Sequence, residues 1–311
     1  MTTHALRLTR RPEPTAAVDA PSRFPSVGIA LGLAGLLAVL AALVGNLVAA
    51  GDTGAQRAET LAWTFGLTTA GFATLKLGIA TILMGVLVRL WLRVDSVKAA
   101  LPALRPAAEP EGAARYGPIG TPYGPAVASP AALEPLPIHR LARRLWSPML
   151  VLGAMLVAAG LALSFLQAGT SDAGDFLALG AWVQGLQFLG EALLLAGISF
   201  LLGSILAALR GGGGEVQEEL GLTVKTLTMP RSAKLFVGLM MLGVVAAMAQ
   251  FVLYAVAASL DDPSTWFAFL APLREFALGL LLSGIVLALA TIGTVLGFQF
   301  ARIREIVVTG R

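Results

Sequence analysis

Four charged side chains lie within long apolar stretches of the 311-residue chain, and these are the residues best placed to do chemistry: Lys76, Glu191, Arg274 and Glu275. A charge inside the hydrocarbon of a bilayer costs roughly 2.5–3.5 kcal/mol on insertion scales unless it is paired or reached by water. Such residues therefore either neutralise one another between helices or line a polar pathway for an ion, a proton or an anionic solute.

Both interpretations stay open on the sequence. If the helices surround a common axis, Lys76 can face Glu191 or Glu275, and a pair there neutralises both charges where the dielectric constant is low. Arg274 and Glu275 follow Pro272, so they also fit the outer membrane interface. These four residues are the candidate ion-pair or pathway set.

The sequence lacks the residue types and motifs that other kinds of catalytic site need. The chain has no Cys and two His, His4 and His139, both outside the apolar stretches. Within this chain alone, these counts exclude disulfides, thiol nucleophiles and a haem held by two His between helices. No cluster has metal-ligand spacing, and the Gly211–Gly214 run lacks the Lys-Ser/Thr of a phosphate-binding loop. We therefore expect no catalytic residue, no metal and no cofactor.

The elements that must position the four charges are membrane helices. The chain is 57% hydrophobic and 13% charged, whereas a soluble domain has roughly half apolar and about a quarter charged residues. A spanning helix needs roughly 20 apolar residues. Six stretches qualify: Val27–Ala50, Leu61–Leu92, Met149–Ala168, Phe176–Leu209, Leu235–Leu260 and Trp266–Ala301. The second, fourth and sixth exceed the others in length, so they must tilt, kink or project from the bilayer.

Basic residues between the stretches predict the orientation. Of the 22 Lys and Arg, 19 fall on one side: Arg7, Arg10, Arg11, Arg23, Arg89, Arg93, Lys98, Arg105, Arg115, Arg140, Arg143, Arg144, Arg210, Lys225, Arg231, Lys234, Arg302, Arg304 and Arg311. The other side has Arg57 together with six acidic residues. This positive-inside pattern predicts cytoplasmic termini. With the alanine-rich helices, it is consistent with a bacterial-type inner membrane, and it favours a bilayer partner over nucleic acid.

The first stretch has a basic lead and small residues at its end, as a cleaved signal does. Its apolar run of about 24 residues is long for a signal core. We therefore expect it to be retained as a helix.

The stretches also suggest an internal repeat of three hairpins. Thr74–Gly85, Leu186–Gly197 and Leu273–Gly284 align without gaps around glycines. In this alignment Lys76 and Glu275 occupy the same position, and Glu191 lies three residues later. Acidic external loops and basic internal loops recur with each pair. The fold class we expect is an all-α integral membrane protein of six helices in three tandem parallel hairpins, with both termini inside.

Little outside the membrane suggests a folded domain. Residues 102–137 hold nine of the 17 Pro, which favours extended, disordered chain, although a docking segment for a soluble partner is the alternative. A basic, apolar segment from His139 to Trp146 predicts a helix at the inner surface, and Gly211–Gly214 predicts a flexible exit from the fourth span. The expected segments are 1–25 (disordered N-terminus), 26–101 (first hairpin), 102–145 (linker), 146–210 (second hairpin), 211–233 (cytoplasmic loop) and 234–311 (third hairpin and basic tail).

These features favour one function over two others. A non-enzymatic membrane subunit, scaffold or assembly factor, partnered by other membrane or cytoplasmic subunits, fits the missing catalytic groups and the long cytoplasmic arms. A transporter or channel for an ion, a proton or a small solute is the alternative, because charges recur at matching depth. A lipid-active enzyme would need an acid/base or metal set at the interface, and none is evident.

Overall fold

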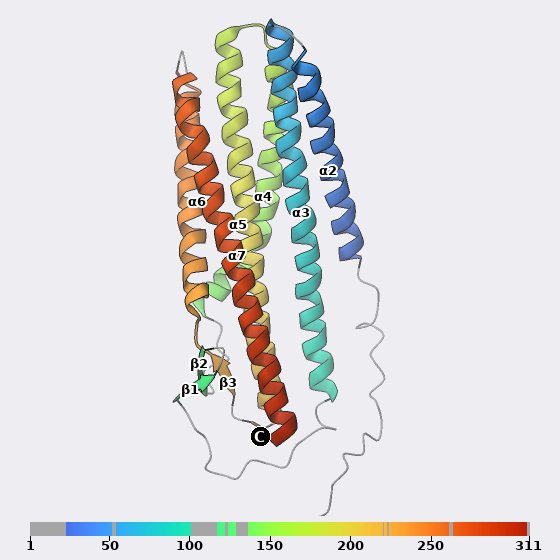
Figure 1. The fold of residues 1–311 in the computed structure, drawn as a ribbon, viewed down its shortest axis with the longest axis vertical. Helices are drawn as coiled ribbons and strands as arrows, with labels where there is room; N and C mark the ends of the chain where they lie inside the picture. The colour runs from blue at the N-terminus through green and yellow to red at the C-terminus, as the bar shows by residue number, and fades with distance from the viewer. Residues whose placement is uncertain are drawn as a thin grey trace, which may run out of the picture.

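A computed structural model describes residues 23–51, 54–100, 117–121, 124–128, 136–219, 221–222, 224–260 and 264–309. This part of the chain is almost entirely helical (Figure 1). Its helices are α2 (Phe24–Ala49), α3 (Gly54–Ala100), α4 (Pro137–Ala168), α5 (Ala173–Glu219), α6 (Arg231–Ala257) and α7 (Ser264–Thr309). The short strands β1 (Gly117–Thr121), β2 (Gly124–Ala128) and β3 (Lys225–Leu227) lie at one end of the bundle.

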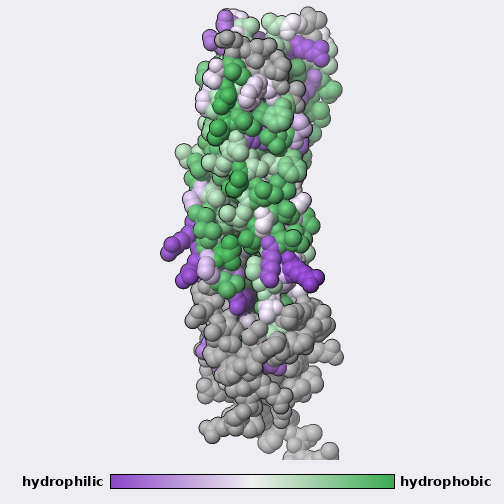
Figure 2. All heavy atoms as spheres, turned by 90° about the vertical axis from the view of Figure 1, so that its left-hand side faces the viewer, coloured by the Kyte–Doolittle hydropathy of each residue, from purple (hydrophilic) through white to green (hydrophobic). Residues whose placement is uncertain are grey.

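The six predicted spans are confirmed. Each of the six helices contains a segment long and apolar enough to cross a membrane. On the face that Figure 2 shows, an apolar belt crosses the bundle, with hydrophilic side chains above and below it. Large apolar side chains on these helices, such as Leu37, Leu47 and Phe300, are exposed, as expected where lipid rather than water surrounds the protein. The chain is a multi-pass membrane protein.

Helix α5 is the centre of the bundle. In its most apolar window 94% of the residues are buried, against 17–33% in the other five helices. Helices α3, α4, α6 and α7 all pack against α5, whereas α2 packs mainly on α3. A helix therefore fills the position that an axial pathway between three hairpins would occupy.

Consecutive helices approach closely through small residues. A Cβ on Gly28 of α2 would lie 2.9 Å from the carbonyl oxygen of Gly78 on α3. A Cβ on Gly153 of α4 would lie 2.7 Å from the carbonyl oxygen of Gly190 on α5. Backbone meets backbone at both points, which is how small residues hold membrane helices together without a hydrophobic driving force.

The second helix of each consecutive pair is the longer one. Helices α3, α5 and α7 have 47, 47 and 46 residues, against 26, 32 and 27 in α2, α4 and α6. At about 1.5 Å per residue a 47-residue helix is roughly 70 Å long, more than twice the roughly 30 Å hydrocarbon thickness. These helices extend past the starts of α2, α4 and α6 at the end that carries the sheet (Figure 1).

Several boundaries differ from the sequence-based expectation. The predicted exit at Gly211–Gly214 is wrong, because α5 continues through these glycines to Glu219. At Gly213 the helix packs against the end of the Gln299 side chain on α7, which would have to shift to admit a Cβ. The segment from His139 to Trp146 is helical as predicted and is continuous with the third span, with Pro148 inside α4. Pro272 likewise lies inside α7 and does not start it.

The Pro-rich segment contains two strands that the sequence analysis did not predict. β1 pairs with β2 and β2 with β3, all antiparallel, so a hairpin from residues 117–128 joins a strand from the α5–α6 connection. Most of the N-terminal segment 1–25 and most of the remaining Pro-rich linker lie outside the described residues.

We expect the α4–α5 contact to tolerate no added methyl group. Gly153→Ala should destabilise the protein by about 1–3 kcal/mol, the usual effect of overpacking, because the new Cβ meets backbone. Gly238→Ala on α6 is the matched control, since nothing lies within 4 Å of its Cβ position. Thermal unfolding in detergent, followed by Trp fluorescence, measures both. Equal stability of the two variants would contradict the close contact.

Candidate functional site

The candidate site is built around Glu191 on the central helix α5. Its side chain is 4% exposed, and both carboxylate oxygens are bound. Lys76 Nζ on α3 lies 2.8 Å from Oε1, and Arg274 Nη2 on α7 lies 3.0 Å from Oε2. One buried carboxylate thus joins three helices by charge-assisted hydrogen bonds, which are stronger than neutral ones.

A cation–π contact adds a direct link between α3 and α7. The guanidinium carbon of Arg274 lies 5.6 Å from the centroid of the Phe65 ring. Arginine is suited to this double role because its planar group can hydrogen-bond at its edge and stack on its face. Arg274 is therefore held by α5 and α3 together.

The cluster holds two positive charges and one negative charge. The Lys76 and Arg274 side chains are 18% and 15% exposed, respectively, whereas the carboxylate between them is 4% exposed. The long cationic side chains thus reach inward from the periphery to Glu191. Removing either cation leaves a neutral pair, whereas removing the carboxylate leaves two unbalanced cations.

Glu275 does not belong to this cluster. Its side chain is exposed, and it forms no hydrogen bond or ion pair with the described residues. Successive helical residues point about 100° apart, so Arg274 and Glu275 cannot both face α5. The structure therefore brings Lys76, Glu191 and Arg274 together and leaves Glu275 outside, although the repeat alignment matched Glu275 with Lys76.

Side-chain amides hold other pairs of helices. Gln250 Nε2 on α6 donates to the carbonyl oxygen of Leu270 on α7 at 2.8 Å, and Gln187 Nε2 on α5 donates to that of Gly66 on α3 at 3.4 Å. Thr64 on α3 donates to Asn46 on α2 at 2.6 Å. This use of amides between helices is the common one in membranes.

A second polar cluster, around Gln217, was missed by the sequence analysis. Gln217 Nε2 donates to the carbonyl oxygen of Lys225 at 3.1 Å, and its Oε1 accepts from the Lys225 backbone N–H at 3.0 Å. Arg302 Nε on α7 donates to the same Oε1 at 3.1 Å. Gln217 thereby fixes β3 to α5 and α7. The sequence held no signal for it, because the glycine run placed this residue in a loop.

The geometry limits what these groups can do chemically. A general base must lie within hydrogen-bond reach of the proton that it takes, and in the described part of the chain the side chains that hydrogen-bond to Glu191 are the two cations Lys76 and Arg274. Within the described ranges no group of three or more His, Asp or Glu could hold a metal ion. The Glu191 cluster is thus organised to join helices.

No protein-family model, curated protein or solved structure matches this chain. The functional inference therefore comes from geometry.

The charge balance of the Glu191 cluster predicts that replacing the carboxylate lowers stability more than replacing one of the two cations. Glu191→Gln leaves Lys76 and Arg274 buried without a counter-charge and should lower stability by about 3–5 kcal/mol. Lys76→Met should cost clearly less, because the Glu191–Arg274 pair remains. The unfolding temperatures of the purified variants measure which of the two is less stable.

Glu275→Gln serves as the control, since it changes an exposed carboxylate one residue from Arg274. We expect it to match the wild-type protein. If Glu191→Gln were no less stable than Glu275→Gln, the joining role of Glu191 would be wrong.

Proposed function

We propose that this protein is a non-enzymatic membrane subunit, scaffold or assembly factor of a larger complex. The observation that carries the proposal is the Glu191 cluster on a central helix: the costliest charges of the membrane region are used to join α3, α5 and α7. Charges inside a membrane otherwise mark pathways for ions or protons.

The filled centre of the bundle supports the same conclusion. Helix α5 occupies the axis, and its neighbours pack on it from several sides. A pathway between hairpins would need a continuous row of polar groups, whereas the α5 residues facing these helices include Phe188, Leu194 and Leu201, all buried and apolar.

We further propose that the helices form three parallel hairpins with both ends inside a bacterial-type inner membrane. The repeat-matched glycines support this arrangement, because each lies against the first helix of its own pair. Positions for a Cβ on Gly85, Gly197 and Gly284 lie 2.7 Å from Phe24, 2.8 Å from Leu150 and 3.6 Å from Phe236, respectively. Exposed basic residues at the starts of α4 and α6 support an inside location for the sheet end, namely Arg140, Arg143, Arg144, Arg231 and Lys234.

The long helix ends and the sheet form the region that we propose for partner docking. The sheet lies beyond the start of α6, at the end of the bundle to which α5 and α7 extend (Figure 1). Gln217 of α5 hydrogen-bonds β3 there and also accepts from Arg302 of α7. In the strand order β1-β2-β3, both outer strands have one unpaired edge within the described sheet. Such edges accept an added strand from a partner.

A transporter or channel is the second candidate function, and one observation favours it. The Glu191 cluster has a net positive charge, since one carboxylate faces two cations. In low dielectric, an excess cation attracts an anion. An anion pathway would require Lys76→Met or Arg274→Met to abolish flux in proteoliposomes while the protein still folds.

The first experiment is gentle purification from the native membrane after chemical crosslinking. We expect a stoichiometric set of other subunits to be recovered with the protein. Gln217→Ala should lower their recovery several-fold, because it releases β3 from α5 and α7. Gln184→Ala is the control, a change of the same type in the outer half of α5. A single homogeneous species that carries solute flux would overturn the proposal in favour of transport.

A further inference from the structure

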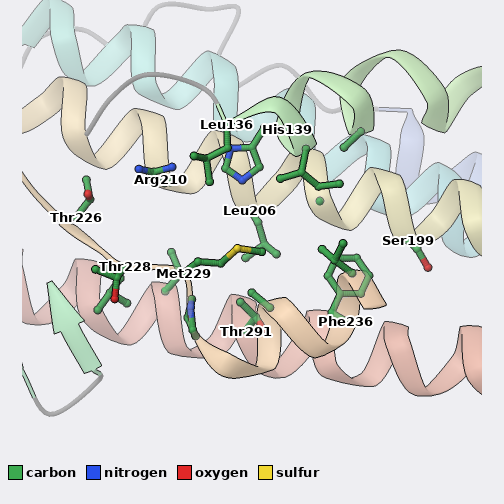
Figure 3. A pocket seen from close by; sticks show the side chains of 18 of the residues that line it. Leu136, His139, Ser199, Leu206, Arg210, Thr226, Thr228, Met229, Phe236 and Thr291 are labelled. Carbon is green, nitrogen blue, oxygen red and sulfur yellow. The ribbon is translucent and has the colours of Figure 1, made fainter. Parts of the chain in front are cut away.

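A cavity of about 400 Å³ opens at the sheet end of the apolar belt and is used by neither polar cluster. It lies between the start of α4, the C-terminal half of α5, the residues joining β3 to α6, the start of α6 and the C-terminal half of α7 (Figure 3). This volume falls within the roughly 300–1,000 Å³ of small-molecule sites.

The cavity is apolar at one end and basic and hydroxylated at the other. Phe236 lies toward the apolar end and Leu206 in the middle, while Arg210, Thr226 and Thr228 lie at the opposite end; Met240 also lines the cavity. None of the described residues that line it is Asp or Glu. A ligand that fits this pattern has an apolar chain and an anionic head.

Arg210 is the group that gives the cavity its charge. Its side chain is half-buried, and Nε is fully buried with no hydrogen-bond partner among the described residues. A buried guanidinium donor without an acceptor is costly, and phosphate oxygens satisfy it with favourable geometry. His139 lies beside Arg210 on the same wall (Figure 3).

The surroundings indicate where the ligand comes from. The cavity lies where α4 and α6 begin, and Arg140, Arg143, Arg231 and Lys234 are exposed near these starts. Basic residues at the edge of the apolar belt attract anionic lipids of the adjacent leaflet. An anionic lipid of that leaflet would bring its head group to this basic edge.

We propose that this cavity binds one anionic phospholipid, with its phosphate at Arg210 and part of an acyl chain along Leu206, Phe236 and Met240. Naming the leaflet as the inner one rests on the proposed orientation. Residues Thr226–Pro230 form one wall, so the bound lipid would also brace the connection between β3 and α6.

The test uses the purified, delipidated full chain and native mass spectrometry. Phosphatidylglycerol and phosphatidylcholine of equal chain length are added separately. We expect one phosphatidylglycerol per chain at concentrations where phosphatidylcholine is not retained. Equal retention of the two lipids, or none of either, would overturn the proposal.

Three variants locate the site. Arg210→Gln should weaken phosphatidylglycerol binding roughly tenfold or more, as expected for the loss of a hydrogen bond to a charged group. Leu206→Trp should weaken it similarly by filling the cavity, and it decides the question if Arg210→Gln does not fold. Arg144→Gln should leave binding unchanged, because Arg144 is exposed on α4 and does not line the cavity. Equal weakening by Arg144→Gln would show general surface attraction and overturn the assignment.

Inorganic phosphate distinguishes the two sources of an anionic group. It should not raise the unfolding temperature at concentrations where phosphatidylglycerol does, because it leaves the apolar part of the cavity empty. Equal stabilisation by phosphate would show that the site takes a free anion and no lipid. None of these outcomes depends on partner subunits, so the lipid site and the proposed function can fail separately.

Discussion

The structure depends on placing one carboxylate, Glu191, inside a low-dielectric bundle. Its burial is tolerable only because Lys76 and Arg274 both reach it, from helices on either side of α5. These two contacts fix how far α3 and α7 are shifted along α5, since neither cation can move by a helical turn without losing its partner. Apolar packing alone would leave this register weakly determined, because the helices are apolar around most of their surface.

The outer helices need no such charges. Helices α2, α4 and α6 are short and rest against their longer neighbours through glycines, as at Gly28 with Gly78 and Gly153 with Gly190. The long helices α3, α5 and α7 then continue beyond the belt, where Gln217 replaces Glu191 as the buried polar group that joins elements. A neutral amide serves there because it must satisfy backbone groups of β3 as well as Arg302.

Sequence reasoning reached the membrane class, the six spans and the residues worth weighing, because hydropathy and the cost of intramembrane charge are local properties. It could not decide which of the charged residues pair with one another. The alignment gave Lys76 and Glu275 the same repeat position and left Lys76 to face either Glu191 or Glu275, whereas the angular position on α7 turns Arg274 inward and leaves Glu275 exposed. The central place of α5 was also hidden, since apolar composition does not distinguish a lipid-facing helix from a buried one. The helical course of Gly211–Gly214 and the strands in the Pro-rich segment depend on tertiary contacts, such as Gly213 with Gln299, that override local propensity.

The central claim is that the Glu191 cluster joins helices and carries no solute. The most direct measurement is the stability and partner recovery of a charge-free variant, Lys76→Met with Glu191→Gln and Arg274→Met. Because replacing a buried ionic cluster by neutral groups of similar volume is often nearly neutral, we expect this triple variant to unfold at a higher temperature than Glu191→Gln alone and to retain the partner subunits that we propose. A triple variant that is no more stable than Glu191→Gln, or one that folds normally but loses its partners, would contradict the account.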